Sequence, residues 1–201
     1  LKFFRDKKVL TPEIYSAGNI KFPCFVKPYD GSLSKGIMLL NDESDLTNTI
    51  IENQKNIFCQ FIDPRKHDEF TVDIYVAKCG SIKCIVPRKR LEVRAGEVSK
   101  AITEKNNICD IILEVFPRLE GVRGCINMQL FRCKSSGKLI FYEINPRFGG
   151  GYPLTDRAGA NFCNWLVQEY FLEKNLDFFH DWNEGLLMLR YDRGIFTNEI
   201  I

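Results

Sequence analysis

Two neighbouring strand-like segments of the sequence carry side chains that suit metal and phosphate chemistry. Gln129 lies in the first segment, and Glu143, Asn145 and Arg147 alternate along the second. Because side chains two apart on a strand point to the same face, Glu143 and Asn145 are predicted to share a face that Arg147 continues. If the two segments pair, the Gln129 amide oxygen joins this group.

One carboxylate and two amide oxygens suit a hard cation such as Mg²⁺, with Mn²⁺ as the alternative, and substrate phosphates supply further ligands. Arg147 is predicted to hold a phosphate or carboxylate through its planar fork. In the competing interpretation, Glu143 is a strand charge paired to Arg147 and Gln129 is an exposed polar position. Burying a carboxylate without a partner is costly, so the pattern favours the metal site.

A glycine-rich segment joins two short predicted strands, 22–27 and 37–40. Glycines allow close backbone approach, and successive N–H groups together with hydroxyls can surround phosphate oxygens. Lys27 would place a point charge on the same anion. A solvated hairpin loop explains the same composition. The candidate phosphate-binding residues of the loop are Gly31, Ser32, Ser34, Lys35 and Gly36.

Hydrophobic periodicity and turn residues predict the remaining elements. Further strands are predicted over 57–62, 70–77, 82–86 and 186–191, and helices over 45–54, 107–119 and 161–172. Ser44 is predicted to cap the first of these helices. The expected fold class is α+β with mostly antiparallel pairing, divided into a smaller lobe over 1–63 and a larger lobe over 64–201.

The bulk composition limits the classes of function. With 201 residues, 45% hydrophobic residues and a net charge of +2, the chain is typical of a globular protein that binds neither nucleic acid nor an anionic membrane. No apolar run approaches the roughly 20 residues that span a bilayer. Eight cysteines without a C-x-x-C motif lie mostly in apolar runs, which predicts free buried thiols in a reducing cytoplasm rather than disulfides or zinc. The chain opens without Met, which suggests a fragment.

Several motifs, in their order and spacing, resemble the ATP-grasp superfamily, and most closely the large subunit of carbamoyl-phosphate synthase and small carboxylate–amine ligases. The resemblance covers residues from about 1 to 175. The matching motifs are 25–28 with the glycine loop, Gln60-Phe61-Ile62, the segment 69–73, Gln129, and the run from Glu143 to Gly151. The fold implied is that of two α+β lobes that clasp ATP, with the glycine loop as a lid over the phosphates.

The resemblance also implies roles for the residues that match the family's motifs. The implied nucleotide-binding set is the glycine loop and Lys27 at the phosphates, the hinge Gln60-Phe61-Ile62 at adenine, and Glu69 at the ribose. The implied metal ligands are Gln129, Glu143 and Asn145. The implied catalytic residues are Lys27, Arg147, which steadies the transferred phosphoryl group, and Arg88, a looser match to a basic residue near the substrate.

The activity implied is an ATP- and Mg²⁺-dependent ligase, which activates a small carboxylate as an acyl phosphate for attack by an amine or ammonia. The alternatives are an ATP-binding module of a larger or split enzyme, inactive alone, and an interaction domain whose motifs are coincidental. The chain departs from the family in three respects: the hinge begins with Gln60 rather than glutamate, a charged insert precedes Glu69, and the family's N-terminal domain is missing. A missing domain or partner subunit is therefore expected.

Overall fold

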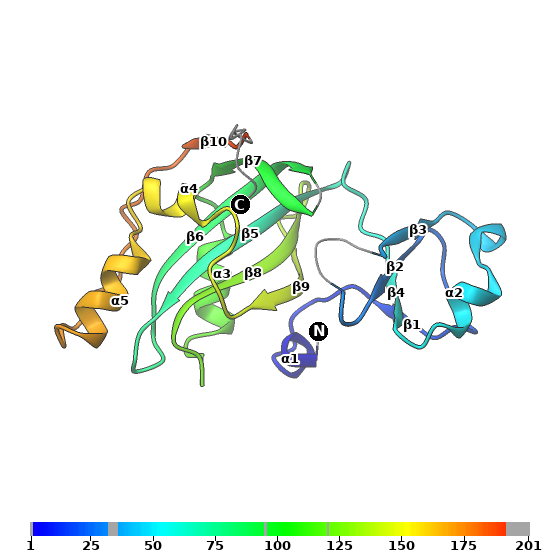
Figure 1. Cartoon of the computed structure of the whole chain (residues 1–201), viewed down its shortest axis with the longest axis horizontal. Coiled ribbons are helices and arrows are strands. Elements are labelled where there is room, and N and C mark those ends of the chain that lie inside the picture. The colour runs from blue at the N-terminus through cyan, green and yellow to red at the C-terminus, as the bar shows by residue number, and fades with distance from the viewer. Residues whose placement is uncertain (1, 32–35, 95, 120, 192–201) are drawn as a thin grey trace, which may run out of the picture.

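The computed structural model describes residues 2–31, 36–94, 96–119 and 121–191, which form two antiparallel sheets (Figure 1). The smaller sheet has the strand order β1-β4-β2-β3, and the larger has the order β10-β7-β6-β5-β8-β9. The edge strand β9 is the part of the larger sheet that lies nearest the smaller one in Figure 1. This arrangement confirms the predicted α+β class with antiparallel sheets.

The smaller sheet uses alternate residues of its central strand to form a core of its own. Cys24 and Val26 of β2 are fully buried and pack with Leu40 and Phe58. Alternation on a strand leaves Phe25 and Lys27 on the opposite face. The elements of this part are β1 (Ile14–Tyr15), β2 (Cys24–Pro28), β3 (Met38–Leu40), β4 (Asn56–Gln60), the 3₁₀ turn η1 (Glu43–Asp45) and α2 (Asn48–Glu52).

The predicted helix over 45–54, and its cap at Ser44, are wrong. The chain forms the turn η1 and then the five-residue helix α2, which begins after Thr47. The Asp42 side chain accepts the Ser44 N–H at 2.8 Å and caps the turn. Short polar side chains that bond to nearby backbone compete with helix formation in this way. Leu46 is extended, with φ −86° and ψ 100°, and this conformation separates the two elements.

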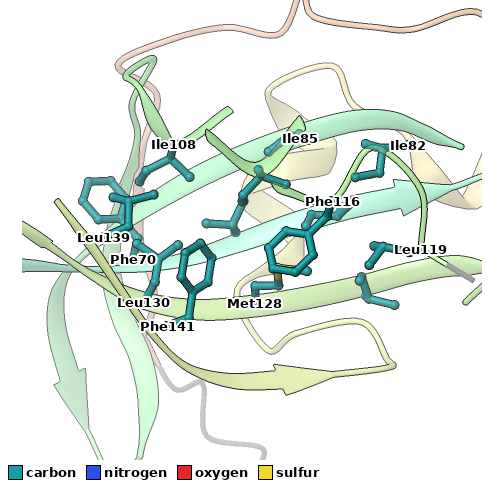
Figure 2. Close-up of a cluster of buried hydrophobic side chains, with 14 of the residues drawn as sticks. Phe70, Ile82, Ile85, Ile108, Phe116, Leu119, Met128, Leu130, Leu139 and Phe141 are labelled. Carbon is teal, nitrogen blue, oxygen red and sulfur yellow. The ribbon is translucent and has the colours of Figure 1, made fainter. Parts of the chain in front are cut away.

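The larger sheet is apolar over the whole of one face, which forms the main core. Figure 2 shows Phe70, Leu130 and Phe141 of this face against Ile108 and Phe116. Phe4 also packs here, so α1 joins the core of the larger sheet. The elements are α1 (Lys2–Asp6), β5 (His67–Val76), β6 (Ile82–Arg94), β7 (Glu97–Thr103), α3 (Ile108–Val115), β8 (Gly124–Cys133), β9 (Leu139–Asn145), α4 (Tyr152–Arg157), α5 (Phe162–Tyr170) and β10 (Leu187–Leu189).

Three boundaries in this part differ from the prediction. The helix α3 ends at Val115, four residues early, because Pro117 disfavours helical conformation at Phe116. The strand β6 continues to Arg94, and β7, which pairs with it, was not predicted. The division of the chain at residue 63 remains a prediction.

The second face of the larger sheet is divided between apolar and polar residues. Tyr75, Cys84 and Val86 lie under Tyr152 of α4 and Phe162 of α5. Farther along the strands, the same face carries polar side chains in register. Arg88 lies opposite Thr71, Thr71 opposite Gln129, and Gln129 opposite Glu143. This row across four strands places the predicted site on the larger sheet.

All eight cysteines are free, and Cys24, Cys59, Cys84 and Cys125 are buried, which confirms the prediction of unpaired thiols. Within the described ranges, no helix is long and apolar enough to cross a membrane.

Candidate functional site

The polar row ends on β9 with the three predicted metal ligands in contact. Gln129 Nε2 lies 3.2 Å from Glu143 Oε1, and Asn145 Nδ2 lies 2.7 Å from the same oxygen. All three side chains are half-buried. The antiparallel pairing of β8 with β9 thus brings Gln129 to the face shared by Glu143 and Asn145. Their role as metal ligands remains a prediction.

A β-bulge at Tyr142 makes this arrangement possible. The register shifts between Gln129, which pairs with Glu143, and Leu130, which pairs with Phe141. Two residues of β9 therefore oppose one step of β8, as bulges require. Phe141 stays in the core, whereas Tyr142 and Glu143 both reach the polar face.

Tyr142 and Arg90 connect the predicted metal and ribose residues. The Tyr142 hydroxyl donates to Gln129 Oε1 at 2.8 Å and also to Glu69 Oε1. Arg90 Nη1 donates to Glu69 Oε1 at 2.6 Å and to Gln129 Oε1 at 3.2 Å. Burial, and then the neighbouring Glu69 carboxylate, raise the pKa of Tyr142 well above its usual value, so the hydroxyl stays protonated. No role was predicted for Tyr142; its position in the polar-apolar alternation gave no signal.

Glu69 therefore lies beside Gln129 and not in an isolated ribose pocket of its own. Its predicted contact with the ribose remains a prediction. The charged turn before β5 keeps Glu69 in a regular strand, because Asp63 accepts the Arg65 backbone N–H at 2.9 Å and His67 already begins the strand.

Lys27 reaches the same site from the smaller sheet. Its Nζ lies 6.0 Å from the centroid of the Tyr142 ring, within the range of a cation–π contact. Lys27 thus faces the polar side of β9, as a phosphate-binding cation of this site would have to. Of the glycine loop, Gly31 and Gly36 are described, and Gly36 has a φ of +72° that glycine readily adopts. The candidates Ser32, Ser34 and Lys35 lie outside the described residues.

The predicted hinge begins at the last residue of β4. The strand ends at Gln60, so Phe61 and Ile62, predicted as its continuation, follow it as connecting chain. The Gln60 N–H donates to the Glu13 carbonyl at 2.8 Å, and the Gln60 side chain accepts the Glu13 N–H at 3.3 Å. Gln60 is therefore bound within the smaller sheet, and adenine recognition by this segment remains a prediction.

Arg147 and Arg88, two predicted catalytic cations, have different environments. Arg147 is exposed just beyond β9, and its Nη1 donates to the Phe148 carbonyl at 3.2 Å. Arg88 is 1% exposed, and its Nε lies 2.8 Å from Asp73 Oδ2. Only Arg147 is accessible to a phosphate in this arrangement.

The oxygens of the site fit Mg²⁺ by their chemistry. Gln129 and Asn145 both donate to Glu143 Oε1, so within the part of the chain that the structure describes the second carboxylate oxygen is available to a cation. The described residues contain no group of three His, Cys, Asp or Glu side chains that could hold a metal. An ion at Glu143 would therefore complete its shell with amide and phosphate oxygens.

Comparison with known proteins agrees with this geometry. The sequence model of the family described as "ATP-grasp in the biosynthetic pathway with Ter operon" matches residues 65–189. That segment contains the polar row with Glu69, Gln129 and Glu143. A search of curated proteins finds no match.

Solved structures share the fold at low sequence identity. N5-carboxyaminoimidazole synthetase from Staphylococcus aureus, complexed with ADP, matches with a TM-score of 0.63 and 16% identity over 78% of this chain and 46% of its own. The biotin carboxylase domain of Hydrogenobacter thermophilus 2-oxoglutarate carboxylase, in complex with MgADP and bicarbonate, matches with a TM-score of 0.68 and 14% identity over 92% of this chain and 47% of its own.

The L-amino acid ligase from Bacillus licheniformis matches with a TM-score of 0.62 and 18% identity, over 84% of this chain and 45% of its own. The chain thus spans less than half the length of each of these three proteins.

Proposed function

We propose that this chain, which belongs to the family of ATP-grasp proteins in the biosynthetic pathway with Ter operon, acts as an ATP- and Mg²⁺-dependent ligase. It would activate a small carboxylate as an acyl phosphate, which an amine or ammonia then attacks. The proposal rests chiefly on one observation: Gln129, Glu143 and Asn145 meet on one face of β8 and β9, where Lys27 approaches from the smaller sheet.

The chemistry requires positioning and charge neutralisation more than a protein nucleophile. When bound, Mg²⁺ (or Mn²⁺) would neutralise and bridge the nucleotide phosphates. Glu143, with the two amides beside it, would hold that ion, and Lys27 would bind the phosphates as a point charge. Arg147, exposed at the end of β9, would hold the transferred phosphoryl group through its fork.

The acceptor side of the reaction is the finer part of the proposal. The named neighbours include a carboxylase domain bound to bicarbonate and an amino acid ligase, which supports a small carboxylate and an amine as substrates. A carbamoyl-phosphate-synthase-like subtype, and a cytoplasmic location suggested by eight free cysteines, belong to the same proposal.

The second candidate is an ATP-binding module of a larger or split enzyme, inactive alone. It is favoured by the coverage of the solved structures, since this chain spans 45 to 47% of each neighbour described above.

ADP release separates these possibilities. Purified protein would be incubated with ATP, Mg²⁺ and a panel of carboxylates and amines, and MgADP binding would be followed by calorimetry. We expect Glu143→Gln to lower turnover by about 100-fold, because it removes the one carboxylate from the predicted metal site. Glu114→Gln, an exposed substitution on α3 behind the opposite face of the sheet, is the matched control.

Binding without ADP release under any condition would favour the module. Full turnover in Glu143→Gln would reject Glu143 as a metal ligand, and an absence of nucleotide binding would reject both functions.

A further inference from the structure

Arg88 lies beneath the glycine-rich segment that follows Arg147, in a fully buried ion pair. Its Nε and Nη2 bind Asp73 Oδ2 and Oδ1 at 2.8 and 3.0 Å. The two side chains are 1% and 0% exposed. The Thr155 hydroxyl also donates to Asp73 Oδ2 at 2.5 Å, as a buried charge pair requires further bonds. The pair therefore ties β5 and β6 to the helix α4.

The remaining nitrogen of the Arg88 guanidinium faces the backbone at Gly151. This Nη1 is buried and has no hydrogen-bond partner among the described residues. A Cβ built at Gly151 would lie 2.1 Å from Nη1 and 3.1 Å from Cζ of Arg88. Gly151 has a φ of −95°, which other residues also adopt. Glycine is therefore required here for space, because the guanidinium lies against the backbone.

The same buried group supports the chain back to Arg147. A Cβ at Gly149 would lie 3.4 Å from both Arg88 Nη2 and Asn127 Nδ2. Asn127 Nδ2 donates to the Arg147 carbonyl at 3.0 Å. The Arg147 side chain is itself exposed, so the placement of its guanidinium depends on the backbone of 147–151.

We propose that Arg88 is a positioning residue for Arg147. Its buried fork sets the path of residues 147–151, and this path directs Arg147 towards the transferred phosphoryl group. The proposal rests on the function proposed above for Arg147. It replaces the expectation that Arg88 meets the substrate, because the guanidinium is enclosed by Asp73 and Gly151.

The test compares two nucleotides that differ by the terminal phosphate. Affinities for MgADP and for a non-hydrolysable MgATP analogue would be measured by calorimetry on the whole chain. We expect Arg147→Ala to weaken the MgATP analogue about tenfold and MgADP less than twofold, because a charge-assisted bond to the terminal phosphate is lost. Arg88→Lys should show the same selective loss, and it should add nothing in the Arg147→Ala background.

A matched pair of glycine substitutions tests the same contact from the other side. Gly151→Ala places a methyl group on Arg88 Nη1 and should reproduce the selective loss. Gly150→Ala places its methyl group 3.7 Å from the Glu97 carboxylate, an ordinary contact, and should change neither affinity. If Arg88→Lys does not fold, Gly151→Ala alone decides the question.

The positioning role would be overturned by equal losses for both nucleotides, by losses from Arg88→Lys that add to those of Arg147→Ala, or by no effect of Gly151→Ala. If the unmodified chain binds neither nucleotide, the proposed function fails instead. The backbone amide resonances of Arg147 to Gly151 then test the placement separately: they should shift in Arg88→Lys while those of Gly185 do not, and unchanged shifts would reject it.

Discussion

Tyr142 donates its hydroxyl to the side-chain oxygen of Gln129 at 2.8 Å, across the bulge where β9 departs from regular pairing with β8. Arg90 donates to the same oxygen at 3.2 Å. In this arrangement Gln129 presents its nitrogen, not its oxygen, to Glu143. A metal ion at Glu143 that takes Gln129 as a ligand must therefore compete with Tyr142 and Arg90 for that oxygen.

Tyr142→Phe should therefore make nucleotide binding less demanding of Mg²⁺. Removing one hydrogen bond to the Gln129 oxygen is worth about 1 kcal/mol, which corresponds to roughly a fivefold lower Mg²⁺ concentration at half-saturation. The measurement is a Mg²⁺ titration at fixed ADP, followed by calorimetry. Tyr170→Phe, on the exposed side of α5, is the control. A higher Mg²⁺ requirement in Tyr142→Phe would show that the hydroxyl supports the metal site.

Lys27→Ala should weaken binding of MgADP about tenfold, because a charge-assisted contact to phosphate is lost. The difference from the unmodified protein should shrink as salt rises, since partly exposed charges are screened. Lys21→Ala is a matched control, because Lys21 lies on the same lobe and pairs with Glu13 at 2.8 Å. Equal effects of the two substitutions would indicate a general charge effect and remove Lys27 from the phosphate site.

Asp73→Asn should lower the free energy of unfolding by about 3–5 kcal/mol, because it leaves the Arg88 charge buried without its partner. Thr155→Val removes only the hydroxyl bond to Asp73 and should cost about 1 kcal/mol. Urea unfolding measures both. Arg65→Ala breaks a pair in which the Arg65 side chain is 87% exposed, and it should cost less than about 1 kcal/mol. A loss in Asp73→Asn no larger than in Arg65→Ala would mean that the buried pair contributes little.

The site was predictable where it depended on residue type and alternation. Glu143 and Asn145 stand two apart, and the structure places them on one face as that spacing requires. Tyr142 was not predictable, because a bulge depends on how a strand pairs and not on its own sequence. Strict alternation would have placed Phe141 on the same face as Glu143, whereas Phe141 lies in the core.

The fold was predictable where apolar periodicity was strong, as in α5, and less so where polar residues form strands. The strand β6 contains Pro87 and a run of basic residues, which argue against a long strand from sequence alone. The buried Arg88 was missed as a structural residue for the same reason: its partner Asp73 is fifteen positions away, on the neighbouring strand.

Cys133, the last residue of β8, should be the most reactive of the partly buried thiols. Its Sγ lies 3.3 Å from the Ser135 hydroxyl, and hydrogen bonds from Ser135 and then Ser136 lower the pKa of the thiol to about 6. Burial instead raises the pKa of Cys109 to about 12. The thiolate is the nucleophile, so at pH 7 Cys133 is mostly in its reactive form and Cys109 is not.

Iodoacetamide should therefore modify Cys133 before Cys109 at pH 7, as followed by peptide mass spectrometry over time. The sign of the pH dependence follows from the lowered pKa: the alkylation rate should rise through a midpoint near pH 6 and level off above it, instead of rising through the ordinary thiol range near 8.5. Ser135→Ala removes the largest stabilising bond and should move the midpoint upward, whereas Ser81→Ala, beside Cys79, should not move it. A rate for Cys133 that rises only above pH 8, or that ignores Ser135→Ala, would show that the two serines do not stabilise the thiolate.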